Sequence, residues 1–101
     1  MSHEGYHEPV QKLRVQTLDM HRALVSLMEE LEAVDWYNQR IDACEDDELR
    51  NILIHNRDEE KEHAAMVLEW IRRQDSFFDG QLRKRLFQEG EIAHPAAIDD
   101  D

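Results

Sequence analysis

Apolar residues recur every three and four positions along the first part of the chain, and this spacing constrains the fold more than any other feature. The repeat is Val10, Leu13, Thr17, Met20, Leu24, Leu27, Leu31 and Val34. A heptad pattern of this length predicts one long helix whose apolar stripe packs on another helix at a shallow angle. Because Pro9 and Glu8 suit a first helical turn, we expect the helix to begin near Glu8 and to run to Gln39 or Ile41.

The apolar pattern stops in the acidic segment 42–48 and resumes at Leu49. We expect a second long helix that ends near Arg73, antiparallel to the first because the connection is short. A third, shorter helix is expected from Phe77 to Phe87, before Gly90. Residues 8–90 then form one helical domain, and we expect segments 1–7 and 91–101 to be disordered. The sequence therefore predicts an all-α fold.

Composition excludes several classes of protein. The chain of 101 residues has 24 acidic and 12 basic side chains, and its net charge of −12 has the wrong sign for binding nucleic acid. No apolar run approaches the roughly 18 residues of a membrane span. The single cysteine, Cys44, cannot form an internal disulfide, which favours a reducing, cytoplasmic compartment. Because a chain this short buries only a thin core, we expect it to associate with other chains.

Polar residues interrupt the inward stripe of the second helix. Asn56, Glu60 and His63 stand where Leu or Val is expected, and burying such groups costs several kcal/mol unless something pairs with them. Glu60 and His63 also form a Glu-x-x-His motif, whose two side chains project from one helix face. Four-helix di-iron bundles use two such motifs, together with a Glu from each of the other two helices.

The first helix offers Glu30 beside its apolar seam, so one chain supplies half of a di-metal site. A two-fold symmetric homodimer would supply the other half. Carboxylates with one imidazole suit Fe(II), Mn(II) and Zn(II). Glu59 or Glu62 could pair with His63 instead, and Glu59 with His55, but Glu60 shares the seam and is preferred.

Other residues near Glu30 have two interpretations each. Tyr37 follows Glu30 by two helical turns, so its hydroxyl could approach the metals, or it could be an ordinary amphipathic residue at a helix end. Glu29, Glu32 and Trp36 form a second stripe that points away from the first. On the residues alone, such a stripe is usually a solvated surface.

Two segments resemble the encapsulated ferritins, the ferritin-like cargo of bacterial encapsulin compartments. They are residues 28–37, MEELEAVDWY, and residues 55–66, HNRDEEKEHAAM, within a similarity that spans 21–73. The resemblance implies a half-bundle protomer that dimerises into a ferritin-like four-helix bundle and assembles into an annular decamer. It implies a ferroxidase that oxidises Fe(II) with O2 and delivers iron for mineralisation inside the encapsulin shell.

Carried over residue by residue, the resemblance implies a di-iron centre made by Glu30, Glu60 and His63 of two chains, with Tyr37 nearby. It also implies a metal-uptake site, able to take iron or calcium, at Glu29, Glu32 and Trp36. The family typically ends in an apolar and basic peptide that docks on the shell, whereas this chain ends with Ile98 and three aspartates. We expect either a truncated sequence or another route to the shell. The competing hypotheses are a metal-independent helical adaptor and a non-oxidising di-metal buffer.

Overall fold

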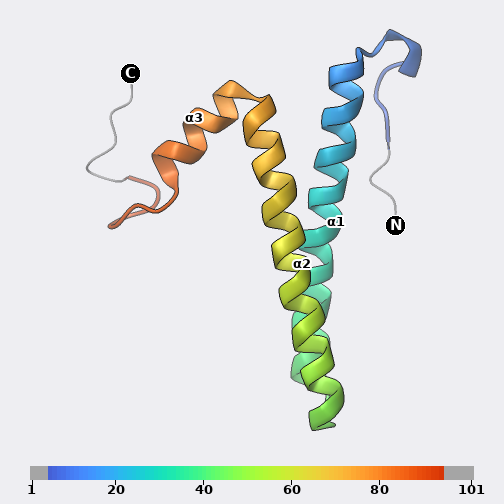
Figure 1. The fold of residues 1–101 in the computed structure, drawn as a ribbon, viewed down its shortest axis with the longest axis vertical. Helices are drawn as coiled ribbons and strands as arrows, with labels where there is room; N and C mark the ends of the chain where they lie inside the picture. The colour runs from blue at the N-terminus through green and yellow to red at the C-terminus, as the bar shows by residue number, and fades with distance from the viewer. Residues whose placement is uncertain (1–4, 95–101) are drawn as a thin grey trace. The chain divides into compact units, whose positions relative to one another are not determined.

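The computed structural model describes residues 5–94 and shows three α-helices in that range, with no strand (Figure 1). A short 3₁₀ turn at Val10–Lys12 precedes helix α1, Val15–Ala43. Helix α2 spans Asp47–Gln74, and the short helix α3 spans Ser76–Arg85. The predicted all-α architecture of two long helices and one short helix is confirmed. The expected disordered ends, 1–7 and 91–101, lie partly outside the described residues.

The first helix begins at Val15, and the expected start near Glu8 is wrong. Pro9 instead caps the 3₁₀ turn, since its carbonyl accepts from the Lys12 N–H at 2.9 Å. Leu13 and Arg14 then adopt extended backbone angles, which interrupts the helical path before α1. The Tyr6 ring stacks on His21, with 4.6 Å between ring centroids, so the segment before α1 folds back along it.

The turn between α1 and α2 is short, as predicted, and makes the two helices antiparallel neighbours. One of the clustered aspartates caps α2, because Oδ1 of Asp46 accepts a hydrogen bond from the Leu49 N–H at 2.8 Å. The Arg50 guanidinium donates to the carbonyl of Cys44, which closes the turn from the other side. Figure 1 shows α1 and α2 side by side, with α1 running down the view and α2 running back up.

The chain divides into two compact units, one up to Ile71 and one from Arg72. In the first unit the buried apolar side chains among the described residues are Ala64 and Ile71, of which Ile71 is fully buried. One set of half-buried positions of α1 follows a helical series, namely Ala23, Leu27, Glu30, Val34, Tyr37 and Ile41. The predicted seam is therefore only partly correct.

Leu27 and Val34 belong to the half-buried series of α1, whereas Leu24, Leu31 and Thr17 of the predicted seam are exposed. The apolar surface of α1 is wider than the strip that one neighbouring helix covers. A rotation of α1 that places Glu30 toward α2 leaves Leu24 and Leu31 on the outer side. No helix among the described residues is apolar enough over a sufficient length to cross a membrane.

In the second unit, helix α3 is anchored at its start and ends two residues earlier than predicted. The Asp75 side chain accepts a hydrogen bond from the Phe78 N–H at 2.9 Å and so caps the helix. The helix ends at Arg85, because Leu86 is extended and Phe87 has a left-handed backbone with φ 60°. Gly90 also has positive φ, but it lies beyond the helix end.

Candidate metal centre

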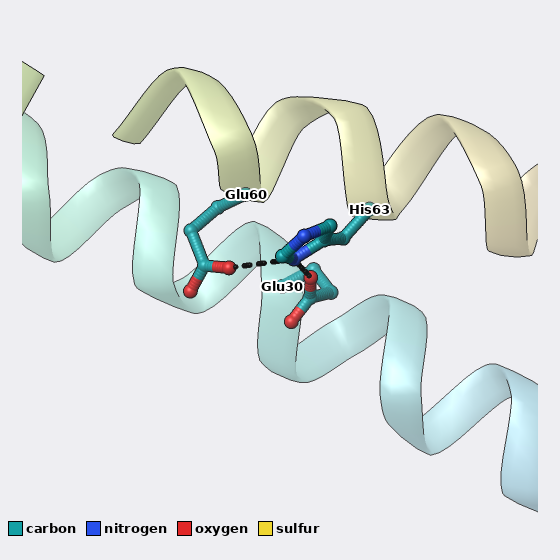
Figure 2. A group of neighbouring side chains, drawn as sticks. All are labelled: Glu30, Glu60 and His63. Carbon is teal, nitrogen blue, oxygen red and sulfur yellow. Dashed lines mark hydrogen bonds and ion pairs between the residues drawn. The ribbon is translucent and has the colours of Figure 1, made fainter. Parts of the chain in front are cut away.

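Three side chains from α1 and α2 converge at the middle of the helix pair (Figure 2). Nδ1 of His63 lies 3.0 Å from Oε1 of Glu60 and 3.0 Å from Oε2 of Glu30. Ligand atoms of the three residues all lie within 4.8 Å of one another. The structure thus brings together the three residues that the sequence selected as metal ligands.

Local helix geometry places these side chains. Glu60 and His63 are three residues apart on α2, so they project from the same face. Glu30 belongs to the half-buried series of α1 and meets them from the opposite helix, as Figure 2 shows. The two carboxylate side chains are 22% and 23% exposed, and the imidazole is 47% exposed. The cluster therefore has a shielded carboxylate side and an accessible imidazole.

The environment of His63 favours a positive charge. Desolvation lowers its pKa, but a hydrogen bond with Glu60 and the negative charges of Glu30 and Glu60 raise the pKa above 6.5. Without metal, the imidazolium partly neutralises the two carboxylates. A metal ion that uses this imidazole as a ligand must displace its proton.

One carboxylate oxygen in the cluster lacks a hydrogen bond. Oε2 of Glu30 is almost inaccessible to solvent and receives no hydrogen bond of acceptable geometry, although His63 lies close to it. A buried acceptor without a donor is unfavourable, and a cation would satisfy it. Two carboxylates and one imidazole form a donor set suited to Fe(II), Mn(II) or Zn(II). The three side chains therefore form a group that could hold a metal ion.

The other selected residues lie outside this cluster. The Tyr37 ring is half-buried, and its described neighbour is the Arg40 guanidinium, 5.5 Å from the ring centroid. The same guanidinium lies 5.9 Å from the Trp36 ring. Glu29 is exposed and Glu32 half-buried, and within residues 5–94 neither joins a group of three potential metal ligands.

The alternative pairings separate clearly. His55 and Glu59 form their own exposed pair, with 3.5 Å between Nε2 and Oε2. Glu62 is exposed, and neither it nor Glu59 belongs to the cluster around His63. The preference for Glu60 as the partner of His63 agrees with the geometry. Sequence reasoning did not select Arg57, whose guanidinium reaches Asn38 on α1, although Arg57 precedes Glu60 by one helical turn.

Residues 5–89 match the family model described as EncFtn-like. A Rhodospirillum rubrum protein named encapsulated ferritin-like protein is 58% identical over 97% of this chain and 70% of its own length. A Thermotoga maritima ferritin-like protein is 54% identical over 88% of this chain and 78% of its own length.

The comparisons also include a more distant relative and a solved structure. A Myxococcus xanthus protein named encapsulin nanocompartment cargo protein EncC is 34% identical over 69% of this chain and 54% of its own length. The crystal structure of protein ne0167 from Nitrosomonas europaea superposes with a TM-score of 0.86 at 66% identity, covering 89% of this chain and 99% of that one.

Proposed function

The chain belongs to the EncFtn-like family, and on this basis we propose that it is a ferroxidase that oxidises Fe(II) to Fe(III) with O2. The observation that carries the proposal is the convergence of Glu30, Glu60 and His63, with an oxygen of Glu30 that lacks a donor. Such a cluster is poorly matched without a cation and suited to a divalent metal. Iron is the substrate that fits a ferritin-like protein with these ligands.

The centre is shared between two copies of the chain. One copy supplies three ligands, whereas a ferritin-like di-iron centre needs six, and a two-fold axis doubles the set. The two-helix unit also exposes apolar side chains that a second copy would cover, including Leu24, Met28 and Leu31. An open groove of about 390 Å³ on the same unit is lined in part by Val67, Met66 and Trp70. The exposure of these apolar surfaces supports a homodimer, which we propose assembles further into an annular homodecamer.

The chain's own side chains bind and orient the substrate. Glu30 and Glu60 offer carboxylate oxygens, and His63 releases its proton as its imidazole becomes a ligand. Each of two Fe(II) ions gives one electron, and O2 accepts the pair. Holding the two ions close together allows both electrons to be delivered in one event. Tyr37 follows Glu30 on the half-buried face of α1, and its hydroxyl would hydrogen-bond to water at the centre.

Glu29, Glu32 and Trp36 form the proposed uptake site. They lie on α1 outside the Glu30 cluster. Where this face meets its symmetry mate, carboxylates from both copies would attract hydrated Fe(II), or Ca(II), and bind it weakly through oxygen.

The protein's compartment follows from its relatives. One relative is named as encapsulated and another as an encapsulin nanocompartment cargo protein. We therefore infer that this chain works inside an encapsulin nanocompartment in the cytoplasm, with the shell protein as its partner. Iron oxidised by the chain would be stored as mineral within the shell, which serves iron storage and detoxification.

Aerobic addition of Fe(II) to the purified protein tests the proposal. Rapid growth of ferric absorbance above the rate of spontaneous oxidation is expected, and a Glu60→Ala/His63→Ala double variant should remove it. Tight binding of Fe(II) without faster oxidation would instead indicate a non-oxidising metal buffer. A protein that neither binds nor oxidises Fe(II) would indicate a metal-independent helical adaptor.

A further inference from the structure

Arg57 joins α2 to α1 through a contact that the proposed function does not use. One terminal nitrogen of its guanidinium donates a hydrogen bond to Oδ1 of Asn38, at 3.1 Å. Its Nε donates to the neighbouring Asp58 carboxylate, also at 3.1 Å. The Arg57 side chain is 24% exposed, so most of it lies against the helix pair. Asp58 thus orients the Arg57 guanidinium on α2, while the terminal nitrogen of the guanidinium reaches Asn38 on α1.

This contact and the Glu30–His63 contact lie at two levels of the same antiparallel helix pair. From Glu30 to Asn38 along α1 is eight residues, or about 12 Å of helix rise. From His63 back to Arg57 along α2 is six residues, or about 9 Å. A single contact lets two helices pivot about it. Two contacts separated along both helices fix their relative rotation and register.

Register matters because the metal ligands come from both helices. A slip of one residue moves a side chain by about 1.5 Å along the helix and rotates it by roughly 100°. Binding sites of this kind need their groups held within about 0.5 Å. Arg57 precedes Glu60 by three residues, so both leave the same face of α2 and a shift at one is felt at the other.

We propose that Arg57 is a positioning residue for the metal centre: its hydrogen bond to Asn38 holds α1 and α2 in the register where Glu30 meets Glu60 and His63. This inference rests on the proposed function, because it concerns the same site. A guanidinium has no lone pair to offer a metal, so Arg57 acts through the helices. Its positive charge alone would repel a divalent cation, and removing the charge would then tighten binding. A positioning role therefore predicts weaker metal binding when Arg57 is replaced, whereas a purely electrostatic role predicts tighter binding.

Titration of the full chain with Co(II), followed by its visible absorption, separates these roles without any oxidation step. Arg57→Gln should weaken Co(II) binding about tenfold, at the lower end of the range for residues that support metal ligands, and should alter the absorption spectrum. Asn38→Ala should do the same, and the double variant should be little worse than either, because both changes break one bond. Asn38→Asp keeps an acceptor oxygen and should preserve the wild-type spectrum.

Lys61→Gln is the matched control. Lys61 lies one turn beyond Arg57 on α2, its ammonium is 3.8 Å from the same Asp58 carboxylate, and its loss removes an equal charge. It should leave Co(II) affinity unchanged or raise it slightly. Unchanged or tighter binding by folded Arg57→Gln or Asn38→Ala would overturn the positioning role and leave the proposed function standing. A wild-type protein that binds no Co(II) would overturn both.

Discussion

Two clusters of charged side chains, one in each compact unit, differ in how completely their charges are matched. In the unit from Arg72, the Asp79 carboxylate accepts hydrogen bonds from Arg72 and Arg83, which lower its pKa. In the unit up to Ile71, the carboxylates of Glu30 and Glu60 share the imidazole of His63, and one oxygen of Glu30 has no donor.

The difference separates a structural role from a binding role. Asp79 has two permanently charged guanidinium partners, so a further cation would gain little there. The Glu30 and Glu60 carboxylates have one partner that can lose its proton, so they retain negative charge for a ligand.

The largest expected effect is the loss of Fe(II) oxidation when the cluster of Glu30, Glu60 and His63 is changed. Glu30→Ala, Glu60→Ala and His63→Ala should each reduce Fe(II) oxidation to the uncatalysed rate, because each would remove one ligand from both halves of the proposed shared centre. Their circular dichroism should remain helical, since removing a poorly matched buried charge can be neutral or stabilising. Glu48→Gln, an exposed change at the start of α2, should retain full activity. Full activity in any of the three Ala variants would contradict the assignment.

Metal should also drive association, because in the proposed function each protomer supplies half of the centre. A ligand that binds only the assembled form, at one hundred times its dissociation constant, favours that form by about 2.7 kcal/mol, or roughly a hundredfold. Anaerobic Fe(II) should therefore shift a dilute sample toward larger species in sedimentation velocity. His63→Ala should abolish the shift. An unchanged size distribution together with tight iron binding by monomers would contradict the shared centre.

Metal affinity should rise with pH. The folded-state pKa of His63 is raised above 6.5, so the protonated form stabilises the metal-free fold below pH 6.5, and this contribution is lost as the pH rises through the folded pKa. Binding must displace the proton, so below that pKa affinity should fall by about tenfold per pH unit for each imidazole. Calorimetry at several pH values checks this, with His21→Gln as a control. A pH-independent affinity would exclude His63 as a ligand.

A smaller effect is expected at the uptake stripe. Glu29 is exposed and Glu32 half-buried, and within the described residues neither joins a group of three possible metal ligands. Glu29→Ala and Glu32→Ala should change the oxidation rate a few-fold, on the scale of electrostatic attraction, while metal analysis still finds the centre occupied. Unchanged oxidation kinetics in both variants, together with no metal near Glu29 and Glu32 in a Ca(II)-soaked crystal, would show that these residues are ordinary solvated surface.

The smallest effect, a local change in stability, is expected in the cluster of Asp79, Arg72 and Arg83. The pKa of Asp79 is lowered below 3.8, so its contribution to stability is present above pH 3.8 and lost as the pH falls through the depressed value. Asp79→Asn should weaken hydrogen-exchange protection of α3 at neutral pH without altering oxidation. Glu89→Gln, an exposed change beyond α3, should leave protection unchanged. Loss of Fe(II) oxidation in Asp79→Asn would contradict a purely structural role for the Asp79 cluster.

Features set by local spacing were predictable from the sequence. The heptad repeat predicts the long helices, and the three-residue separation of Glu60 and His63 places them on one face. The start of α1 at Val15 was not predictable, because the preceding segment folds back through a contact between Tyr6 and His21, which are distant in sequence. The pair Asn38 and Arg57, 19 residues apart, meets only in one register of the two helices.

The rotation of α1 shows a further limit of the pattern. Leu24 and Leu31 fit the repeat as well as Leu27 and Val34 do, yet only the latter two are half-buried. The apolar stripe of α1 is wider than the strip that one neighbouring helix can cover. The sequence pattern therefore does not reveal which edge of the stripe packs on α2 and which is left for another copy of the chain. In the structure, the edge that contains Glu30 faces α2.

Anomalous diffraction at the iron edge, from crystals loaded anaerobically with Fe(II), tests the central claim most directly. We expect two iron positions per pair of chains, each within bonding distance of carboxylate oxygens or imidazole nitrogen from Glu30, Glu60 and His63, with both chains contributing to the centre. Iron absent from this cluster, or bound by the ligands of one chain alone, would contradict it.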